Sequence, residues 1–167
     1  MEKKKRNIII IVILVIVLLF QKQTIKEYSY QDGTLVEKYQ VSLIFRFRWG
    51  YDKMYYKGGK VVQDEVHYSF NFLNGKAFEY FENGNIKFEA TYKFNKLWNV
   101  HMYLNYQGAD LDYGNFNNGN GHLKMYYKSG ELMKEGEVRD GQYYEKWKYY
   151  TNVGFFYREY ENNVMLF

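Results

Sequence analysis

The sequence of 167 residues contains no cysteine and no proline, and only three histidines. The lack of cysteine excludes a disulfide framework, a thiolate zinc site, a cysteine nucleophile and a cysteine-linked lipid anchor. The lack of proline leaves every backbone N–H free to donate within a β-sheet. The histidines, His67, His101 and His122, have none of the short spacings that prearrange metal ligands.

Few other residues form a pattern that indicates chemistry. Ser129, one of four serines, lies in an expected turn, and no serine lies in a nucleophile elbow. The acidic segment from Asp110 resembles part of a calcium loop, but it lacks glycine at its sixth position and glutamate at its twelfth. Glu135 and Glu137 fit the polar outer face of a strand better than an acid–base pair. We therefore expect a non-enzymatic protein with no catalytic residue, no metal site and no cofactor.

The positive charge is concentrated at the amino terminus. The formal net charge is +4, and the first six residues, MEKKKR, account for +3 of it, which leaves +1 for the rest. The folded part therefore lacks the basic patch that is the electrostatic footprint of nucleic-acid binding. We expect no nucleic-acid partner.

One long hydrophobic run, Ile8–Phe20, follows these basic residues. As a helix its thirteen residues span roughly 20 Å, less than the roughly 30 Å hydrocarbon core of a bilayer. The length suits a signal peptide, but no small-x-small cleavage site follows. We interpret residues 1–20 as a signal anchor or transmembrane segment, with its amino terminus in the cytoplasm and the rest outside. A secreted or periplasmic protein, after cleavage, is the alternative. Residues 21–27 are expected to be a linker.

The rest of the chain has an internal period. Six glycines recur at intervals of 22 to 26 residues: Gly33, Gly59, Gly84, Gly108, Gly130 and Gly154. Aromatic residues stand three and four positions before most of them, and an apolar residue stands two positions after most. A second turn residue returns eleven positions after several of them. This order of strand, tight turn and strand predicts a β-hairpin, in which glycine supplies the positive φ of the turn.

Such hairpins must stack, because a single hairpin is marginally stable in water. We predict a mostly β fold in which residues 28–167 form five or six stacked antiparallel β-hairpin units, as an elongated twisted sheet or solenoid. One N-terminal hydrophobic helix precedes them. The pattern weakens over residues 104–121, which are rich in Asn, Gly and Asp. The alternating segment Ser42–Asp52 predicts an added strand.

Aromatic residues are unusually frequent, with 20 Tyr and 13 Phe. Neighbouring rings in a strand point to opposite faces, so one ring of each pair must pack in the core and the other can line an exposed stripe. The candidate partner face comprises either the rings four residues before the glycines or those three residues before them. The first set is Tyr55, Tyr80, Tyr126 and Tyr150.

Three segments, residues 75–86, 121–136 and 141–154, resemble the bacterial variant of the MORN repeat. In that variant a glycine precedes Trp-x-x-Tyr, two or three polar residues, a second glycine and, one residue later, a leucine. The resemblance covers about residues 28–160 and implies a sheet of stacked β-hairpins. Bacterial members are commonly classed as YwqK-type antitoxins, and eukaryotic relatives resemble membrane-associated scaffolds. The repeat specifies a fold, and a fold alone does not decide function.

We therefore predict a membrane-tethered protein-interaction scaffold that binds a protein partner and contacts the membrane through Ile8–Phe20. An antitoxin-like role is one form of this function. The alternative is an extracytoplasmic binding module that takes cell-wall glycan or lipid headgroups on an aromatic stripe.

Overall fold

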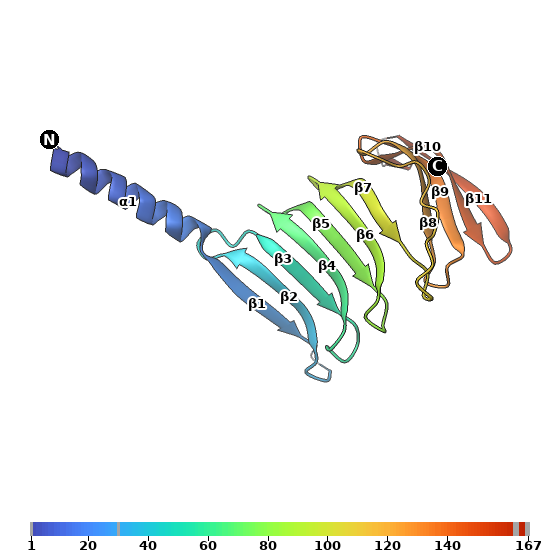
Figure 1. Ribbon diagram of the computed structural model, residues 1–167, viewed down its shortest axis with the longest axis horizontal. Coiled ribbons are helices and arrows are strands. Elements are labelled where there is room, and N and C mark those ends of the chain that lie inside the picture. The colour runs from blue at the N-terminus through green and yellow to red at the C-terminus, as the bar shows by residue number, and fades with distance from the viewer. Residues whose placement is uncertain (1, 30, 162–163, 166–167) are drawn as a thin grey trace.

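The computed structural model describes residues 2–29, 31–161 and 164–165. One α-helix is followed by two antiparallel sheets (Figure 1). The first sheet has seven strands in chain order: β1 (Lys22–Tyr28), β2 (Leu35–Ser42), β3 (Gly50–Tyr55), β4 (Val62–Ser69), β5 (Phe72–Tyr80), β6 (Ile86–Lys93) and β7 (Lys96–Tyr103). The second has five: β8 (Gly121–Tyr126), β9 (Leu132–Arg139), β10 (Gln142–Thr151), β11 (Gly154–Glu161) and β12 (Val164–Met165). The predicted mostly β fold with one N-terminal helix is confirmed.

Helix α1 (Glu2–Phe20) projects from one corner of the first sheet (Figure 1). The aliphatic side chains from Ile8 to Leu18 are exposed. Within the described residues, no helix combines the length and the apolar character that crossing a membrane requires. Residues 21–27, which we expected to be a linker, are instead almost entirely strand, because β1 pairs residue by residue with β2 from Lys22 onward. Only Gln21 separates the helix from the sheet.

The strands of the first sheet follow one another through turns, so the turns alternate between two edges (Figure 1). Each edge in this sense is a row of turns at one end of the strands, not an outer strand. We call the row beside α1 the helix-side edge and the opposite row the far edge. All six spaced glycines lie at turns with positive φ, between 66° and 141°. At the far edge, the hydroxyl of Tyr56 donates to the carbonyl of Tyr80 at 2.6 Å. Tyr127 donates in the same way to the carbonyl of Tyr150 in the second sheet, at 3.1 Å.

The alternating segment Ser42–Asp52 does not form one added strand. Residues 43–45 make a turn, one isolated bridge joins Val41 and Arg48, and β3 begins only at Gly50. The aromatic residues that produce the alternation pack at the helix-side edge instead. Ring packing between neighbouring turns, rather than strand pairing, therefore determines this segment.

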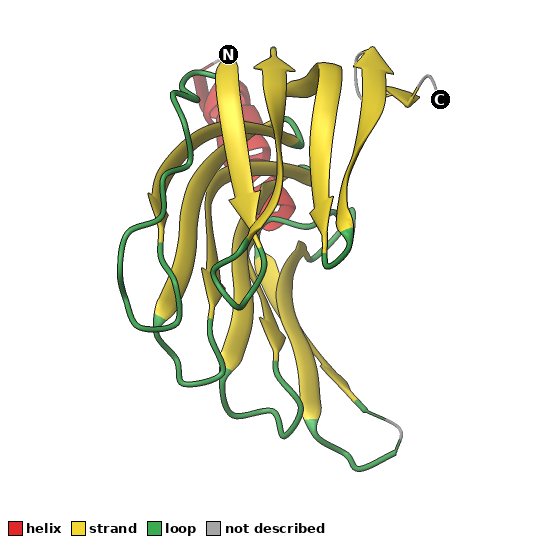
Figure 2. Ribbon diagram, turned by 90° about the vertical axis from the view of Figure 1, so that its right-hand side faces the viewer, coloured by secondary structure: helices red, strands yellow, loops and turns green. Residues whose placement is uncertain are grey.

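Residues 104–120 connect the two sheets through turns and isolated bridges. The hydrophobic core lies where the sheets meet, and its buried members are Phe88, Ala90, Val100, Tyr103, Phe116, Leu123, Val138 and Trp147. Phe116 comes from the connection itself. The indole N–H of Trp147 donates to the carbonyl of Glu137 at 2.8 Å, and a Cβ on Gly136 would come within 2.6 Å of its ring. Figure 2 shows the second sheet in front of the bowed strands of the first.

Candidate functional site

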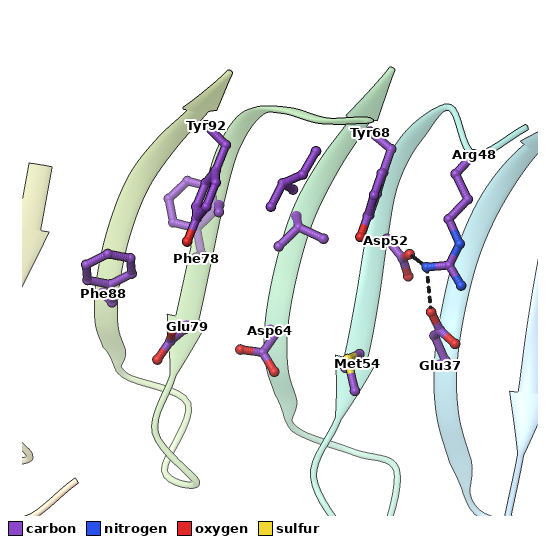
Figure 3. A pocket seen from close by; sticks show the side chains of 13 residues that line it. Glu37, Arg48, Asp52, Met54, Asp64, Tyr68, Phe78, Glu79, Phe88 and Tyr92 are labelled. Atoms are coloured by element: carbon purple, nitrogen blue, oxygen red, sulfur yellow. Dashed lines mark hydrogen bonds and ion pairs between the residues drawn. The ribbon is translucent and has the colours of Figure 1, made fainter. Parts of the chain in front are cut away.

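A hollow of about 230 Å³ lies on one face of the first sheet, over β2 to β6 (Figure 3). We call this the inner face, because it continues into the core. Successive strands supply one acid each to the hollow: Glu37 from β2, Asp52 from β3, Asp64 from β4 and Glu79 from β5. A row of carboxylates therefore crosses the sheet, and Arg48 lies at its β2 end.

The hollow exists because small or polar residues occupy a position that large residues fill elsewhere. Four of the six positions that stand seven residues before a spaced glycine are buried: Asp52, Ala77, Leu123 and Trp147. The other two, Lys26 in β1 and His101 in β7, are exposed. Leu123 and Trp147 fill the core of the second sheet. Ala77 and Asp52 are too small to fill the same volume over the first sheet, where a close-packed interior would need larger side chains. Side-chain size at one aligned position therefore sets the hollow.

Asp52 is the most buried acid of the hollow, with 4% of its surface exposed. Its Oδ2 pairs with the guanidinium of Arg48, which also lies 2.9 Å from Oε1 of Glu37. Among the described protein atoms, Oδ1 of Asp52 has no hydrogen-bond partner. Burial raises the pKa of Asp52 to about 6, with Arg48 opposing the shift and Glu37 adding to it. A buried acceptor without a donor costs free energy. A donor that reached Oδ1 would therefore bind favourably.

Asp64 and Glu79 stand directly opposite each other on β4 and β5. Like charges in this arrangement repel. Burial, followed by the charge of Glu79, raises the pKa of Asp64. The Nζ of Lys87 lies 2.8 Å from Oε2 of Glu79, whereas within the described part of the chain Asp64 has no ion pair. The charges of Lys87 and Lys128 partly oppose this rise, without an ion pair to Asp64 among the described residues.

Aromatic rings stand beside the carboxylates, among them Tyr68, Phe88 and Tyr92 (Figure 3). Burial raises the pKa of Tyr92 to about 12, so its hydroxyl is neutral. The guanidinium of Arg48 lies 4.4 Å from the ring centroid of Tyr39 and 5.6 Å from that of Tyr68. This arginine therefore shows the binding chemistry of the face, in which carboxylates and ring faces hold a planar cation.

The hollow has the groups that bind a cation. Among the described residues that line it there are four carboxylates and several aromatic rings, and no histidine, serine or cysteine. Across the described residues, no group of three potential ligands is placed to hold a metal ion. A guanidinium or ammonium group would donate hydrogen bonds to Asp52 Oδ1 and would neutralise Asp64.

The four candidate tyrosines, Tyr55, Tyr80, Tyr126 and Tyr150, lie outside the hollow and are divided between the two sheets. All are half-buried. The hydroxyl of Tyr126 donates to the carbonyl of Asp112 at 2.7 Å, and that of Tyr150 donates to a carboxylate of β9. Tyr80 lines a shallow depression on the other face of the first sheet. These rings therefore belong to more than one surface.

The three histidines occupy separate environments. His67 Nδ1 lies 2.7 Å from a backbone carbonyl, and His101 Nε2 lies 2.7 Å from a threonine hydroxyl. His122 lies between Glu135, at 3.3 Å, and Glu137, at 3.0 Å. The structure thus brings together a histidine and two acids that the sequence analysis had considered separately. They are not among groups able to hold a metal ion in the described chain.

Sequence reasoning missed the hollow, although one signal was present. Alignment on the spaced glycines puts Asp52 at the position of Trp147, and a carboxylate there indicates a buried polar group. The row of acids is harder to find, because irregularities between Met54 and Tyr55 and after Val66 shift the strand register.

No family model, curated protein or solved structure matches this chain. The resemblance to MORN repeats therefore stays a prediction from the three segments that carry it.

Proposed function

We propose that this chain is a non-enzymatic, membrane-tethered interaction module of stacked β-hairpin repeats, and that it binds a protein partner through the hollow. A lysine or arginine side chain of the partner enters between Asp52 and Asp64. Helix α1 provides the tether through Ile8–Phe20, with its amino terminus in the cytoplasm and the sheets outside. An antitoxin-like role is the special case in which the partner is a toxin.

The observation that carries this proposal is the orphan oxygen of Asp52. A buried carboxylate oxygen costs free energy unless a donor reaches it. Asp64, nearby in the same hollow, has no ion pair among the described residues and faces Glu79 across the strands. One incoming cation would contact both acids. Among the described residues no donor reaches Oδ1 of Asp52, and Lys87 and Lys128 act on Asp64 without forming an ion pair with it.

The size of the hollow supports a side chain rather than a whole small molecule as the guest. Its volume of about 230 Å³ is below the roughly 300–1,000 Å³ of common small-molecule pockets. The contact of Arg48 with Asp52 and the Tyr68 ring provides an internal precedent for a guanidinium here. A larger ligand would have to bind mostly outside the hollow.

Binding of a labelled arginine-containing peptide to the full chain in neutral detergent tests this proposal by fluorescence anisotropy. Asp64→Asn should weaken binding about tenfold, which corresponds to about 1.4 kcal/mol, because one charge-assisted contact is lost. Binding by the unmodified chain should strengthen from pH 5 to pH 7.5, because Asp52, with its pKa of about 6, becomes ionised.

Asp140→Asn is the matched control, since it removes the same charge from an exposed turn of the second sheet. It should leave the affinity unchanged. A peptide with citrulline in place of arginine controls for the charge of the guest. Equal weakening by both variants, or equal binding of the citrulline peptide, contradicts the proposal. Binding of cell-wall glycan fragments that is indifferent to Asp64→Asn would favour the glycan-binding alternative.

A further inference from the structure

Four two-residue turns have both residues at positive φ. Their first residues are Phe70, Phe94, Asn118 and Asp140, with φ values of 52°, 47°, 49° and 49°. Their second residues are Asn71, Asn95, Gly119 and Gly141. Hydrogen bonds link these turns in series. The Asn71 side chain accepts from the N–H of Arg48 at 2.6 Å, and that of Asn95 accepts from the N–H of Leu73 at 2.7 Å. The N–H of Gly119 donates to Trp98, and that of Gly141 to Gly119, each at 2.7 Å.

The first residue of these turns differs between the first sheet, which holds Phe70 and Phe94, and the rest of the chain, where Asn118 lies in the connection and Asp140 in the second sheet. Asn118 and Asp140 are residue types that tolerate positive φ, whereas a bulky aromatic residue there is strained. Phe70 and Phe94 are nevertheless exposed, by 49% and 68%. The ring of Phe70 packs on that of Trp49, with centroids 4.5 Å apart, and Phe94 packs on Phe72, but about half or more of each surface stays exposed. Strained, exposed apolar residues indicate a binding role.

The two rings are part of a larger apolar strip on the helix-side edge. Leu43, Ile44 and Phe45 are exposed in the turn beside α1. The rings of Phe47 and Phe70 lie 4.9 Å apart. Those of Phe72 and Phe94 lie 5.8 Å apart. The strip therefore extends from the first turn of the edge to the turn between β6 and β7.

The turns of this edge contain no acid, and their basic residues besides Arg48, which is paired with Asp52 and Glu37, are Arg46, Lys93 and Lys96. The three turns read LIFRFRW, SFNF and KFNK, over residues 43–49, 69–72 and 93–96. Aromatic and basic residues together are typical of protein surfaces that enter the headgroup region of an anionic bilayer. At the far edge, the turns at residues 31–34 and 81–85 each contain an acid, whereas the turn at residues 56–61 contains two lysines and no acid. The edges therefore differ in their exposed aromatic residues more than in their charge.

The apolar helix ends at the same edge. Only Gln21 lies between α1 and β1, and the carbonyl of Gln21 accepts a hydrogen bond from the N–H of Leu43 at 2.8 Å. The guanidinium of Arg46 donates to the side chain of Gln23. The exposed aliphatic helix and the aromatic strip are therefore continuous. If the helix is the proposed tether, the bilayer that holds it lies next to the strip.

We infer that the helix-side edge of the first sheet rests in the headgroup region of an anionic lipid bilayer, with Phe45, Phe70, Phe72 and Phe94 inserted as wedges. The contact holds the edge at the bilayer surface. It rests on the proposed tether through α1, and it is separate from the hollow, so it does not depend on the proposed peptide binding.

The test uses the full chain reconstituted in vesicles of phosphatidylcholine with phosphatidylglycerol. Because the chain has no cysteine, one added cysteine carries one environment-sensitive nitrobenzoxadiazole dye. Phe94→Cys labels the strip, and Tyr106→Cys labels an exposed residue beyond the opposite end of β7. Brominated lipids should quench the dye at residue 94 and blue-shift its emission, with no effect at residue 106. Quenching at residue 94 should be weaker in phosphatidylcholine alone.

A second set of chains removes the contribution of the dye to binding. Ser69→Cys carries the dye beside an intact turn, with Phe70 and Phe94 either present or both replaced by Asn, the residue at position 118. The double replacement should reduce quenching at residue 69 to the level of residue 106. The proposal is overturned if residue 94 is quenched no more than residue 106, or if the replacements change nothing at residue 69. Dye self-quenching that depends on protein density, without quenching by brominated lipid, overturns it in favour of a second copy of the chain.

Discussion

The two sheets use the same aligned position in opposite ways. In the second sheet it holds Leu123 and Trp147, which close the core. In the first sheet it holds Ala77 and Asp52, which leave a hollow edged by carboxylates. Two sheets with similar hairpins can therefore differ in role through single side chains. One sheet gains packing, and the other keeps a buried carboxylate.

The largest effect should come from removing the large buried side chain at this aligned position of the second sheet. Trp147→Ala should lower the free energy of unfolding by roughly 3–5 kcal/mol, because it removes a fully buried ring and leaves a cavity. Urea unfolding of the full chain in neutral detergent measures this loss. Trp98→Ala, at a half-buried tryptophan, is the control and should cost less. Equal losses would mean that the aligned position has no special part in the core.

An intermediate effect should come from the same position in the first sheet. The folded pKa of Asp52 is about 6, above its usual 3.8, so the folded chain retains a proton that the unfolded chain has lost between these values. This contribution to stability is present in full below pH 3.8 and is lost as the pH rises through about 6. Asp52→Asn removes it. The stability of Asp52→Asn relative to the unmodified chain should therefore rise by up to about 3 kcal/mol from pH 4 to pH 7.

Urea unfolding at a series of pH values measures this difference. Paired acids elsewhere, such as Glu135, whose pKa is lowered chiefly by the Tyr150 hydroxyl, act with the opposite sign in both chains and cancel in the comparison. Asp140→Asn should follow the unmodified chain. A flat difference between Asp52→Asn and the unmodified chain would show that the carboxylate of Asp52 is not desolvated.

The smallest effect concerns the turns. Phe94→Asn should raise the free energy of unfolding by about 1 kcal/mol, because it relieves a bulky residue at positive φ. Asp140→Asn, at the equivalent position of the second sheet, should change it by less than about 0.5 kcal/mol. The same unfolding assay compares the two variants. A loss of stability in Phe94→Asn would mean that the ring contributes to the fold and is not placed there for a ligand.

Local patterns predict much of this fold. The spaced glycines mark turns, and the second turn residues Asn95, Gly119 and Gly141 all have positive φ. These features depend on a few neighbouring residues, so sequence reveals them. The strand β1 was missed because its residues are mostly polar and exposed, and only pairing with β2 makes them a strand.

Features that depend on distant contacts were not predictable in this way. The division into two sheets occurs within residues 104–120, which resemble an ordinary loop until Phe116 is seen in the core. The hollow requires four acids to share a face, which depends on the register of β2 to β5. The candidate tyrosines shared a position in the sequence units, but the sheets divide them.

The direct junction between α1 and β1 also determines how the fold bears a mechanical load. A force between α1 and the rest of the chain enters β1 at Lys22 and leaves β2 at Ser42, and these two residues are partners. The hairpin is therefore loaded as a zipper, one hydrogen bond at a time, which is its weaker direction. The bonds from Leu43 to Gln21 and from Arg46 to Gln23 lie at the end where peeling begins. These two hydrogen bonds must therefore break before the pairing of β1 with β2 can open.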